Sequence, residues 1–581
     1  MMKRRSAVFG LLLLTGCPYS DGCEAAPEGS ADPAAATPPA EGEPEAGPSE
    51  PQPDAATGTT DDAGPRPKGP PIEFGAEPTG GAALSTLTCP ALAMPLAGAV
   101  AVVYVDASAT GAEAGTQAAP FKTIGKALEN APRGAAVWVA AGTYKEAITA
   151  LDKDLVLFGG FAPGFASRTD ACATIIEPPD TTMTAITSGR EVASFGIEGV
   201  TVQKAARGLS ATADETADAH VTIARCVFKN NGTKTTTGGG VALENVAARV
   251  YMSVFKDNIA SKGAALVFNA QHEAVIDQNL FEHNLGYSDH GGGIYLTPRS
   301  AKVTRNTFRG NATGVNINDG AGGGWGGAAI VDNDELDKPT RADFSYNVFT
   351  ENVAGIGGGI FVDQGATLTM SHDIFYANRA YLEGTDTQDT FAALRGAAIY
   401  VDGTGLGPEG ASKFTGEYLT VVNNVYDALG RPRSKATYGG NIYVEGFSKA
   451  TVTNSIFWNN GPDAFYVEGN SELTVRFSIG ASACTSSNAM GPIPASTTIC
   501  KIGTGVFLPS SMSFADETNG DFHERSTAGR FSNGSWILDS FTSAGIDKAD
   551  PSATVATEPM PNGARANLGA FGGTREASKS P

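Results

Sequence analysis

The sequence predicts an all-β fold, one long right-handed parallel β-helix with a helical cap at its N-terminal end and a cap segment at its C-terminal end. Three observations predict it: two short motifs that recur about every 26 residues, strand-forming residues around them, and a chain of 581 residues with 72 glycines and only 18% charged residues. Glycine-rich, charge-poor chains with many Val, Thr, Ile and Phe residues are typical of β-rich proteins with tight turns.

The first motif is Phe-x-x-Asn. Its phenylalanines follow one another at spacings of 27, 26, 27, 41, 26 and 82 residues, and the widest gap holds a degenerate copy at 419–424. The motif residues are Phe228/Asn231, Phe255/Asn258, Phe281/Asn284, Phe308/Asn311, Phe349/Asn352, Phe375/Asn378 and Phe457/Asn460.

The second motif is a Gly-Gly pair, or Gly-Ala, followed by a short apolar strand, as in Gly-Gly-Gly-Ile-Tyr-Leu from Gly291. Copies start at Gly238, Gly263, Gly291, Gly326, Gly357, Gly396 and Gly439. A third strand-like run, such as Leu368-Thr-Met, precedes each phenylalanine.

Each repeat therefore holds three short strands and three turns. A repeat of 26 residues is too short for a strand-helix-strand unit, which takes roughly 30, but it suits one coil of a parallel β-helix, whose coils stack about 4.8 Å apart. We expect phenylalanine to stack on phenylalanine inside, and asparagine on asparagine at a turn with left-handed backbone. Longer loops at fixed corners explain the 41-residue spacing.

The N-terminus has the features of an export signal. Lys3, Arg4 and Arg5 precede a short apolar run that ends in Leu14-Thr-Gly-Cys17. Leu-Thr-Gly-Cys resembles the lipobox of bacterial lipoproteins, which implies that Cys17 carries the lipid. Pro18, rather than Asp, follows the cysteine, and by the same resemblance this implies anchorage to the outer membrane. We expect display at the cell surface.

Residues 24–80 contain twelve Asp and Glu residues, thirteen of the 33 prolines and only two basic residues. Such a segment cannot bury a core, and we interpret it as a disordered, self-repelling stalk. The predicted organisation is a signal peptide and lipobox at 1–17, the stalk at 18–80, a cap with the first coils at 81–190, the repeats at 191–480 and the C-terminal segment at 481–581. The net charge of −21 excludes nucleic acid as a partner.

Six cysteines remain after lipidation, and six can pair in fifteen ways. Cys484 and Cys500 flank a Gly/Ser/Thr-rich loop and form the most plausible bridge, whereas Cys226 shares strand parity with Phe228 and is expected as a small buried side chain. No spacing resembles a zinc site, so we expect no metal or other cofactor.

Both ends of the predicted solenoid carry capping signals. In residues 120–130, Ile124, Ala127 and Leu128 have helical spacing, and a helix there would cover strand edges that invite aggregation. Residues 519–573 resemble a segment often found after bacterial β-helices. Its Asp547 and Asp550 could contact a metal, although turn-forming aspartate is the better interpretation.

The fifth position of the Gly-Gly strands suggests a binding surface. The fourth and sixth positions are apolar in all copies and must point inward, so the fifth position points outward. This predicts an aromatic stripe on the outer face, with Trp325 beside it. It could bind sugar rings or a partner protein, or loops could cover it so that it only stabilises the ladder. The candidate binding residues are Tyr295, Trp325, Phe361, Tyr400 and Tyr443.

We identify no catalytic residues from the sequence. The densest carboxylate cluster is Asp332-Asn-Asp-Glu-Leu-Asp337, and Asp289 and Asp319 lie in nearby repeats. An enzyme would need Asp289, Asp319, Asp332 and Asp334 to converge on one ligand. Solvated turn residues are the alternative.

Over residues 100–480 the paired motifs look like the passenger repeats of chlamydial polymorphic outer-membrane proteins, which are adhesins, and the architecture resembles the pectate-lyase-like superfamily. No C-terminal translocation barrel is apparent, so a lipid anchor would replace it. The acidic stalk, the lipid anchor and the lack of a recognisable catalytic set favour a monomeric, membrane-anchored protein that binds a polysaccharide or a surface protein without catalysis. A purely structural envelope component fits the same features. A polysaccharide lyase or glycoside hydrolase is the alternative.

Overall fold

The computed structural model describes residues 88–95, 99–150, 153–189, 194–314, 324–333, 338–381, 395–404, 407–427, 441–460, 464–480, 484–487 and 498–581. All of them belong to a unit of residues 67–581. The signal peptide, Cys17 and the stalk lie outside the described residues. Where the chain is described, no helix combines the length and apolar composition needed to cross a membrane.

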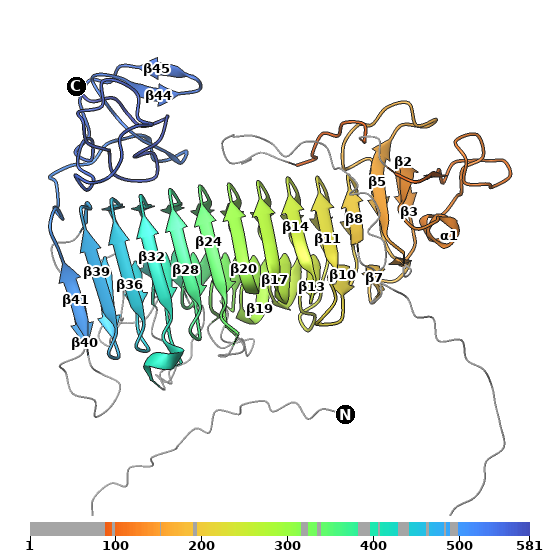
Figure 1. Cartoon of the computed structure of the whole chain (residues 1–581), viewed down its shortest axis with the longest axis horizontal. Helices are drawn as coiled ribbons and strands as arrows, with labels where there is room; N and C mark the ends of the chain where they lie inside the picture. The colour runs from red at the N-terminus through yellow and green to blue at the C-terminus, as the bar shows by residue number, and fades with distance from the viewer. Residues whose placement is uncertain are drawn as a thin grey trace, which may run out of the picture. The chain divides into compact units, whose positions relative to one another are not determined.

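The chain forms a parallel β-helix in which each strand pairs in register with strands of the preceding and following coils (Figure 1). The Gly-Gly motifs form the first strand series. Its strands are β4 (Ile148–Ala150), β7 (Thr184–Ser188), β10 (Arg207–Thr212), β13 (Val241–Glu244), the first part of β17 (Leu266–Asp277) and of β20 (Ile294–Thr304), β23 (Ala329–Val331), β27 (Ile360–Val362), β31 (Ile399–Val401), β35 (Ile442–Val444), β38 (Phe465–Glu468) and β40 (Thr485–Ser487).

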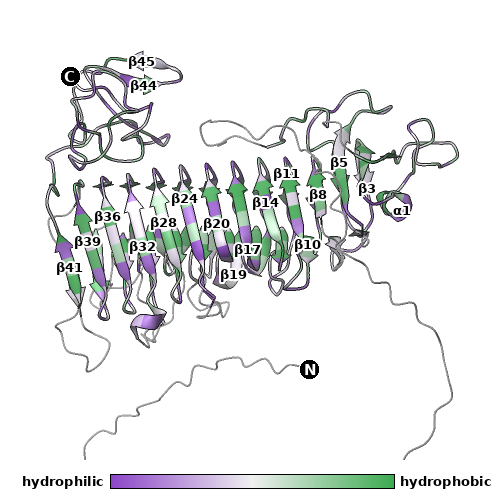
Figure 2. Ribbon diagram, in the orientation of Figure 1, coloured by the Kyte–Doolittle hydropathy of each residue, from purple (hydrophilic) through white to green (hydrophobic). Residues whose placement is uncertain are grey.

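The second series precedes each phenylalanine and joins the first series in one sheet, because β17 and β20 run through both. Its strands are β1 (Val102–Val105), β2 (Ala135–Ala140), β5 (Leu155–Phe161), β8 (Ser194–Glu198), β11 (His220–Ala224), β14 (Ala247–Tyr251), the second parts of β17 and β20, β24 (Arg341–Ser345), β28 (Thr367–Ser371), β32 (Lys413–Glu417), β36 (Lys449–Thr453), β39 (Glu472–Arg476) and β41 (Ile499–Ile502). The strands from β24 to β32 alternate more exposed and buried residues, whereas those near the N-terminal cap are almost wholly buried; Figure 2 shows both hydrophobic and hydrophilic residues along the series.

The third series carries the phenylalanines and forms a separate sheet. Its strands are β3 (Gly142–Tyr144), β6 (Thr174–Ile176), β9 (Thr201–Gln203), β12 (Val227–Lys229), β15 (Val254–Lys256), β18 (Leu280–Glu282), β21 (Thr307–Arg309), β25 (Val348–Thr350), β29 (Ile374–Tyr376), β33 (Thr420–Val422) and β37 (Ile456–Trp458).

A fourth series, which the sequence analysis did not predict, follows the asparagines on six coils. Some of its strands have only two residues, too few for an alternating pattern to show in the sequence. They are β16 (Ile259–Lys262), β19 (Leu285–His290), β22 (Ala312–Thr313), β26 (Val353–Ala354), β30 (Arg379–Tyr381) and β34 (Val425–Asp427).

The predicted phenylalanine stack is confirmed. Phe228, Phe255, Phe281, Phe308, Phe349 and Phe375 are fully buried, with ring centroids of successive residues 4.4–5.3 Å apart and nearly parallel planes. The offset rings fill the interior of each coil, so this row is a continuous core along the axis.

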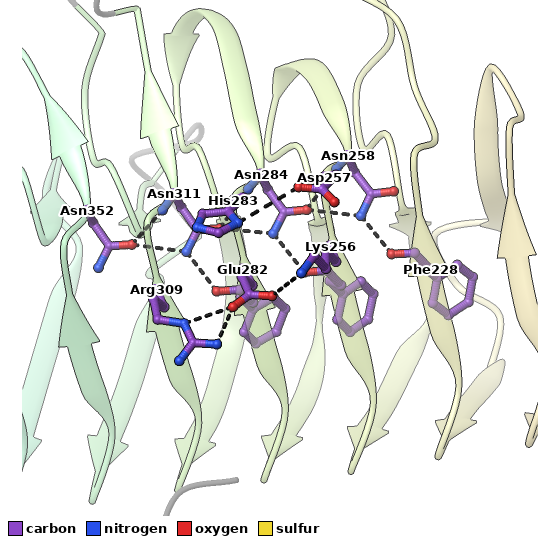
Figure 3. Close-up of polar contacts among 12 residues, drawn as sticks. Phe228, Lys256, Asp257, Asn258, Glu282, His283, Asn284, Arg309, Asn311 and Asn352 are labelled. Atoms are coloured by element: carbon purple, nitrogen blue, oxygen red, sulfur yellow. Dashed lines mark hydrogen bonds and ion pairs between the residues drawn. The ribbon is translucent and has the colours of Figure 1, made fainter. Parts of the chain in front are cut away.

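The asparagines form a buried ladder beside this core (Figure 3). Asn284 shows the pattern: its Nδ2 donates to Oδ1 of Asn311 and to the carbonyl of Phe255, and its Oδ1 accepts from Asn258. The turn has the left-handed backbone that the sequence predicted, at the residue before the asparagine, such as Asp257 or His283. The asparagine side chain therefore turns inward and satisfies backbone groups at the corner.

A second polar ladder lies at the turn between the second and third series. Amide Nδ2 groups donate along it from Asn279 to Asn306, from Asn306 to Asn347, and from Asn347 to Asp373. The next coil has Leu419 at this turn, and the Leu419 backbone N–H donates to Ser455 instead. Asp373 ends the row without difficulty because a carboxylate only accepts hydrogen bonds.

A short helix covers the N-terminal end of the solenoid. At the N-terminal end α1 (Ile124–Asn130) buries Ile124, Ala127 and Leu128, as predicted, and Glu146 accepts hydrogen bonds from the backbone N–H groups of Ile124 and Gly125. The 3-10 helix η2 (Pro408–Gly410) precedes β32. A disulfide joins Cys89 to Cys172, and another joins Cys484 to Cys500, while Cys226 is free and buried.

The C-terminal segment contains two antiparallel ribbons, one of β42 (Phe514–Asp516) with β43 (Asp521–Glu524) and one of β44 (Arg530–Ser532) with β45 (Ser535–Ile537). It packs on the outer face of the last coils of the third series, where Phe514, Phe522 and Leu568 share an apolar cluster with Ile374, Val422 and Ile456. Asp550 caps its own turn by accepting from Ser552, which agrees with the turn interpretation of this residue.

Asp373 is fully buried, and this burial raises its pKa from the usual 3.8 to about 7. Between these values the folded chain holds a proton that the unfolded chain has released. The free energy of unfolding should therefore fall as the pH rises from about 4 to about 7, by at most about 1.4 kcal/mol per pH unit from this group.

We predict that Asp373→Asn removes this contribution, so that the denaturation midpoint of the variant falls less between pH 5 and pH 8 than that of the parent chain. Chemical denaturation followed by circular dichroism at constant salt measures both. Asp343→Asn, on the exposed face of β24, is the matched control and should behave like the parent. Equal pH slopes for the Asp373 variant and the parent would contradict the prediction.

Candidate functional site on the first strand series

The aromatic stripe is not the open surface that the sequence allowed. Tyr295, Phe361, Tyr400 and Tyr443 are at most 3% exposed, and Trp325 is partly buried against them. They point away from the phenylalanine core and form an apolar cluster of their own with Val267, Ile330 and Tyr466. Tyr466 extends the stripe by one coil. The sequence analysis did not include it because no Gly-Gly pair precedes this strand, although Phe465-Tyr-Val467 repeats the strand pattern.

A row of carboxylates runs beside the stripe. An acidic residue follows the inward-facing valine of the first series on five successive coils, and backbone hydrogen bonds stack neighbouring members, as from Asp363 N–H to Val331 and from Asp402 N–H to Val362. The members of this acidic row are Asp332, Asp363, Asp402, Glu445 and Glu468. The recurring Val-Asp or Val-Glu pair was a visible signal that the sequence analysis missed.

The tyrosine hydroxyls bond to the acidic row of the following coil. Tyr295 donates to Oδ2 of Asp332 at 2.6 Å, Tyr400 donates to Glu445, and Tyr443 donates to Glu468. This diagonal contact explains why the tyrosines are buried although they lie outside the core. Each ring packs on its neighbours along the ladder, and each hydroxyl still has a polar partner.

Arg395 lies against the acidic row. Its Nη1 is 2.8 Å and 3.0 Å from the two carboxylate oxygens of Glu445, and it donates to the hydroxyl of Tyr400 at 3.3 Å. The guanidinium also lies over the ring of Tyr443, 5.3 Å from its centroid. Its Nε is buried with no hydrogen-bond partner in the described part of the chain.

The carboxylates of the row have unequal environments. Burial, together with the like charges of Glu445 and Asp363, raises the pKa of Asp402 well above its usual value. Burial also raises the pKa of Glu445, but Arg395 opposes this effect. Asp402 therefore favours its protonated form, while Arg395 supports the charged form of Glu445.

Aromatic and basic groups gather at the upstream coils. The ring of His290 meets Trp325 edge to face, with centroids 4.7 Å apart, and Lys262 Nζ lies 4.8 Å over the ring of Tyr295. Burial, reinforced by the charge of Lys262, lowers the pKa of His290 to about 3. The imidazole is therefore neutral at physiological pH.

The predicted convergence of carboxylates falls largely outside the described residues. Of the four aspartates, only Asp332 has a described side chain, and it belongs to the acidic row; Asp319, Asp334 and the side chain of Asp289 lie outside. Cys89, Asp170 and Cys172 are near enough to hold a metal, but a disulfide occupies both sulfurs. A hollow of about 530 Å³ between α1 and Lys145 adjoins a helix N-terminus that Glu146 already caps.

Comparisons with known proteins agree with the architecture. A family model described as "Right handed beta helix region" matches residues 186–338, and one described as "Protein of unknown function (DUF1565)" matches residues 107–150. The chain is thus a right-handed parallel β-helix. A comparison with curated proteins finds no match.

Solved structures that resemble the chain are distant. The pectate lyase Pel9A is 12% identical over 81% of this chain and 96% of its own, with a TM-score of 0.37. The catalytic unit of a GH87 α-1,3-glucanase from Streptomyces thermodiastaticus strain HF3-3 is 15% identical over 71% of this chain and 70% of its own, with a TM-score of 0.30. A pectin methylesterase from Aspergillus niger is 14% identical over 70% and 95%, with a TM-score of 0.19.

The Arg395–Glu445 pair gives a test of the electrostatics. Both side chains are mostly buried, so removal of the guanidinium leaves a buried carboxylate without its counter-charge. We predict that Arg395→Met lowers the free energy of unfolding by about 3 kcal/mol near neutral pH, and that the double variant Arg395→Met/Glu445→Gln recovers most of it. Chemical denaturation measures the free energy of unfolding of both variants. If the single and the double variant lose the same free energy, Arg395 and Glu445 are not coupled.

Proposed function

We propose that this protein is an exported, lipid-anchored β-helix that binds a neutral glycan along the outer face of its first strand series. The observation that carries the proposal is the acidic row with its tyrosine partners and Arg395, on successive coils of a rigid sheet. Carboxylates accept hydrogen bonds from sugar hydroxyls, and the partly exposed ring of Trp325 can pack against the apolar face of a sugar.

The insertions in the repeat support this choice of face. Segments 315–323, 382–394 and 428–440 are inserted directly before the first-series strands β23, β31 and β35. In solenoid proteins such insertions gather on one face, and this is often the binding face. In the sequence, the three insertions therefore fall at the same position of the repeat, ahead of a first-series strand.

The charge of the row selects the class of glycan. Buried and half-buried carboxylates run along this face beside Arg395, so an acidic polysaccharide would meet like charge along most of it. A neutral chain meets no such repulsion.

The anchoring part of the proposal rests on the Leu-Thr-Gly-Cys motif at Cys17, followed by the acidic stalk. A lipid at Cys17 would hold the protein at the bacterial outer membrane, and the stalk would give the β-helix reach from the surface. In this proposal the protein is a monomer that acts without a metal or another cofactor.

A glycan panel tests the proposal. We predict that the mature chain without its lipid, residues 18–581, binds neutral glucans or galactans and not polyuronates in isothermal titration calorimetry. Asp402→Asn and Trp325→Ala should weaken binding at least about tenfold, by loss of one charge-assisted hydrogen bond or one stacked ring. Asp343→Asn is the control on another face. A preference for polyuronates, or equal binding by the variants and the parent, would refute the proposal.

Glycosidic hydrolysis is a second candidate function, favoured by the unequal pair Asp402 and Glu445. They lie on adjacent coils, about 4.8 Å apart in backbone, and retaining glycosidases hold two carboxyl groups about 5–5.5 Å apart. A protonated Asp402 would donate a proton to the leaving oxygen, and Glu445 would act as nucleophile.

The same panel, assayed for new reducing ends, separates binding from hydrolysis. If the chain cleaves a bound glycan, we predict that Asp402→Asn lowers the rate by about 10²–10⁴-fold, because the general acid is lost. A bound glycan that stays intact supports the binding function alone.

A further inference from the structure

The largest group of exposed apolar side chains lies in the C-terminal segment, away from the acidic row. Twelve large hydrophobic side chains are exposed in the described part of the chain, and four of them fall within residues 536–541. These four define the apolar tip: Trp536 (38% exposed), Ile537 (44%), Leu538 (71%) and Phe541 (42%). Soluble proteins scatter such residues singly, so a cluster in one short stretch indicates an interaction site.

The tip is held on a small ribbon. Strand β45 pairs with β44 in an antiparallel register that sets Trp536 opposite Phe531, and all three residues of β45 are exposed. In Figure 1 this ribbon lies on the side of the C-terminal segment away from the strands of the β-helix. The packing of the segment on the third series leaves this edge uncovered.

The one acid within the tip sequence is turned away from the surface. Asp539 lies between Leu538 and Phe541, but its side chain is only 10% exposed. Arg530 Nε lies 3.2 Å from its carboxylate, and the backbone N–H of Ser526 donates to it at 2.9 Å. The negative charge is therefore compensated inside the segment, and the face of the tip remains apolar.

Cations border the tip instead. Lys579 Nζ lies 4.3 Å over the ring of Trp536, and the guanidinium of Arg525 lies 5.5 Å over the ring of Phe541. This pattern is notable in a chain whose net charge is −21. It also disfavours a sugar as the ligand, because Lys579 covers a face of the indole on which a sugar ring would stack.

We propose that the apolar tip inserts into the interface of an anionic phospholipid bilayer. Tryptophan prefers the boundary between headgroups and acyl chains, Ile537, Leu538 and Phe541 supply apolar area for the acyl region, and lysine and arginine reach back to lipid phosphates. This membrane contact is separate from the lipid proposed at Cys17 and from glycan binding on the first series.

Vesicle binding by the mature chain without its lipid tests the proposal. We expect residues 18–581 to sediment with vesicles of phosphatidylcholine and phosphatidylglycerol, more than with pure phosphatidylcholine, and a blue shift of tryptophan emission on binding. Ile537→Ser/Leu538→Ser should weaken binding at least about tenfold, because two exposed apolar side chains are removed. Lys579→Glu should weaken binding only to the anionic vesicles.

Met560→Ser is the matched control, because Met560 is 72% exposed in the same segment but outside the tip; it should bind like the parent. Circular dichroism confirms that each surface variant is folded. Absence of vesicle binding, or equal binding by Ile537→Ser/Leu538→Ser, would overturn the proposal. Dimerisation through the tip, seen in light scattering and lost in the double variant, would replace it with self-association. The tip variants leave the acidic row unchanged. Glycan binding by these variants therefore tests the proposed function separately from membrane binding.

Discussion

Every strand of the β-helix depends on hydrogen bonds that its backbone makes with neighbouring coils. Because neighbouring coils pair residue on residue, any side chain that turns inward meets its counterpart one coil away. A phenylalanine must therefore suit another phenylalanine, and an asparagine another asparagine. Few residue types stack on themselves so well, since flat rings gain contact area and amides offer both a donor and an acceptor. The repeat in the sequence is a direct result of this constraint.

The same constraint makes the outer face chemically unusual. Superposition of coils places carboxylate beside carboxylate in the acidic row, where like charges close together are unfavourable. The chain relieves this with tyrosine hydroxyls, with Arg395 and with protonation, and the raised pKa of Asp402 is the result. The cost of assembling this row is consistent with the ligand binding proposed above.

Much of the fold was predictable from the sequence, because stacked coils require similar residues at equivalent positions, and this requirement produces a regular repeat. The phenylalanine core, the cap helix with Ile124, Ala127 and Leu128 inside, and the inward direction of the valines were all read from spacing. Less was predictable of the site. The outward direction of Tyr400 follows from strand parity, but its burial depends on Glu445, forty-five residues further along the chain, and parity carries no information about such contacts. The packing of the C-terminal segment on Ile456 was missed for the same reason, since it depends on distant contacts, whereas the fourth strand series was missed because some of its strands are too short to show a pattern.

The ladder that ends at Asp373 has a direction. The side-chain amides of Asn279, Asn306 and Asn347 all donate toward the C-terminal end of the solenoid, so their dipoles align head to tail along its axis. A row of aligned amides has its positive end where the last N–H points, as an α-helix has at its N-terminus. Asp373 occupies that end. The solenoid thus offers a buried carboxyl group the electrostatic setting that helices offer to anions, which opposes the effect of burial and accounts for an acid in the middle of an apolar core.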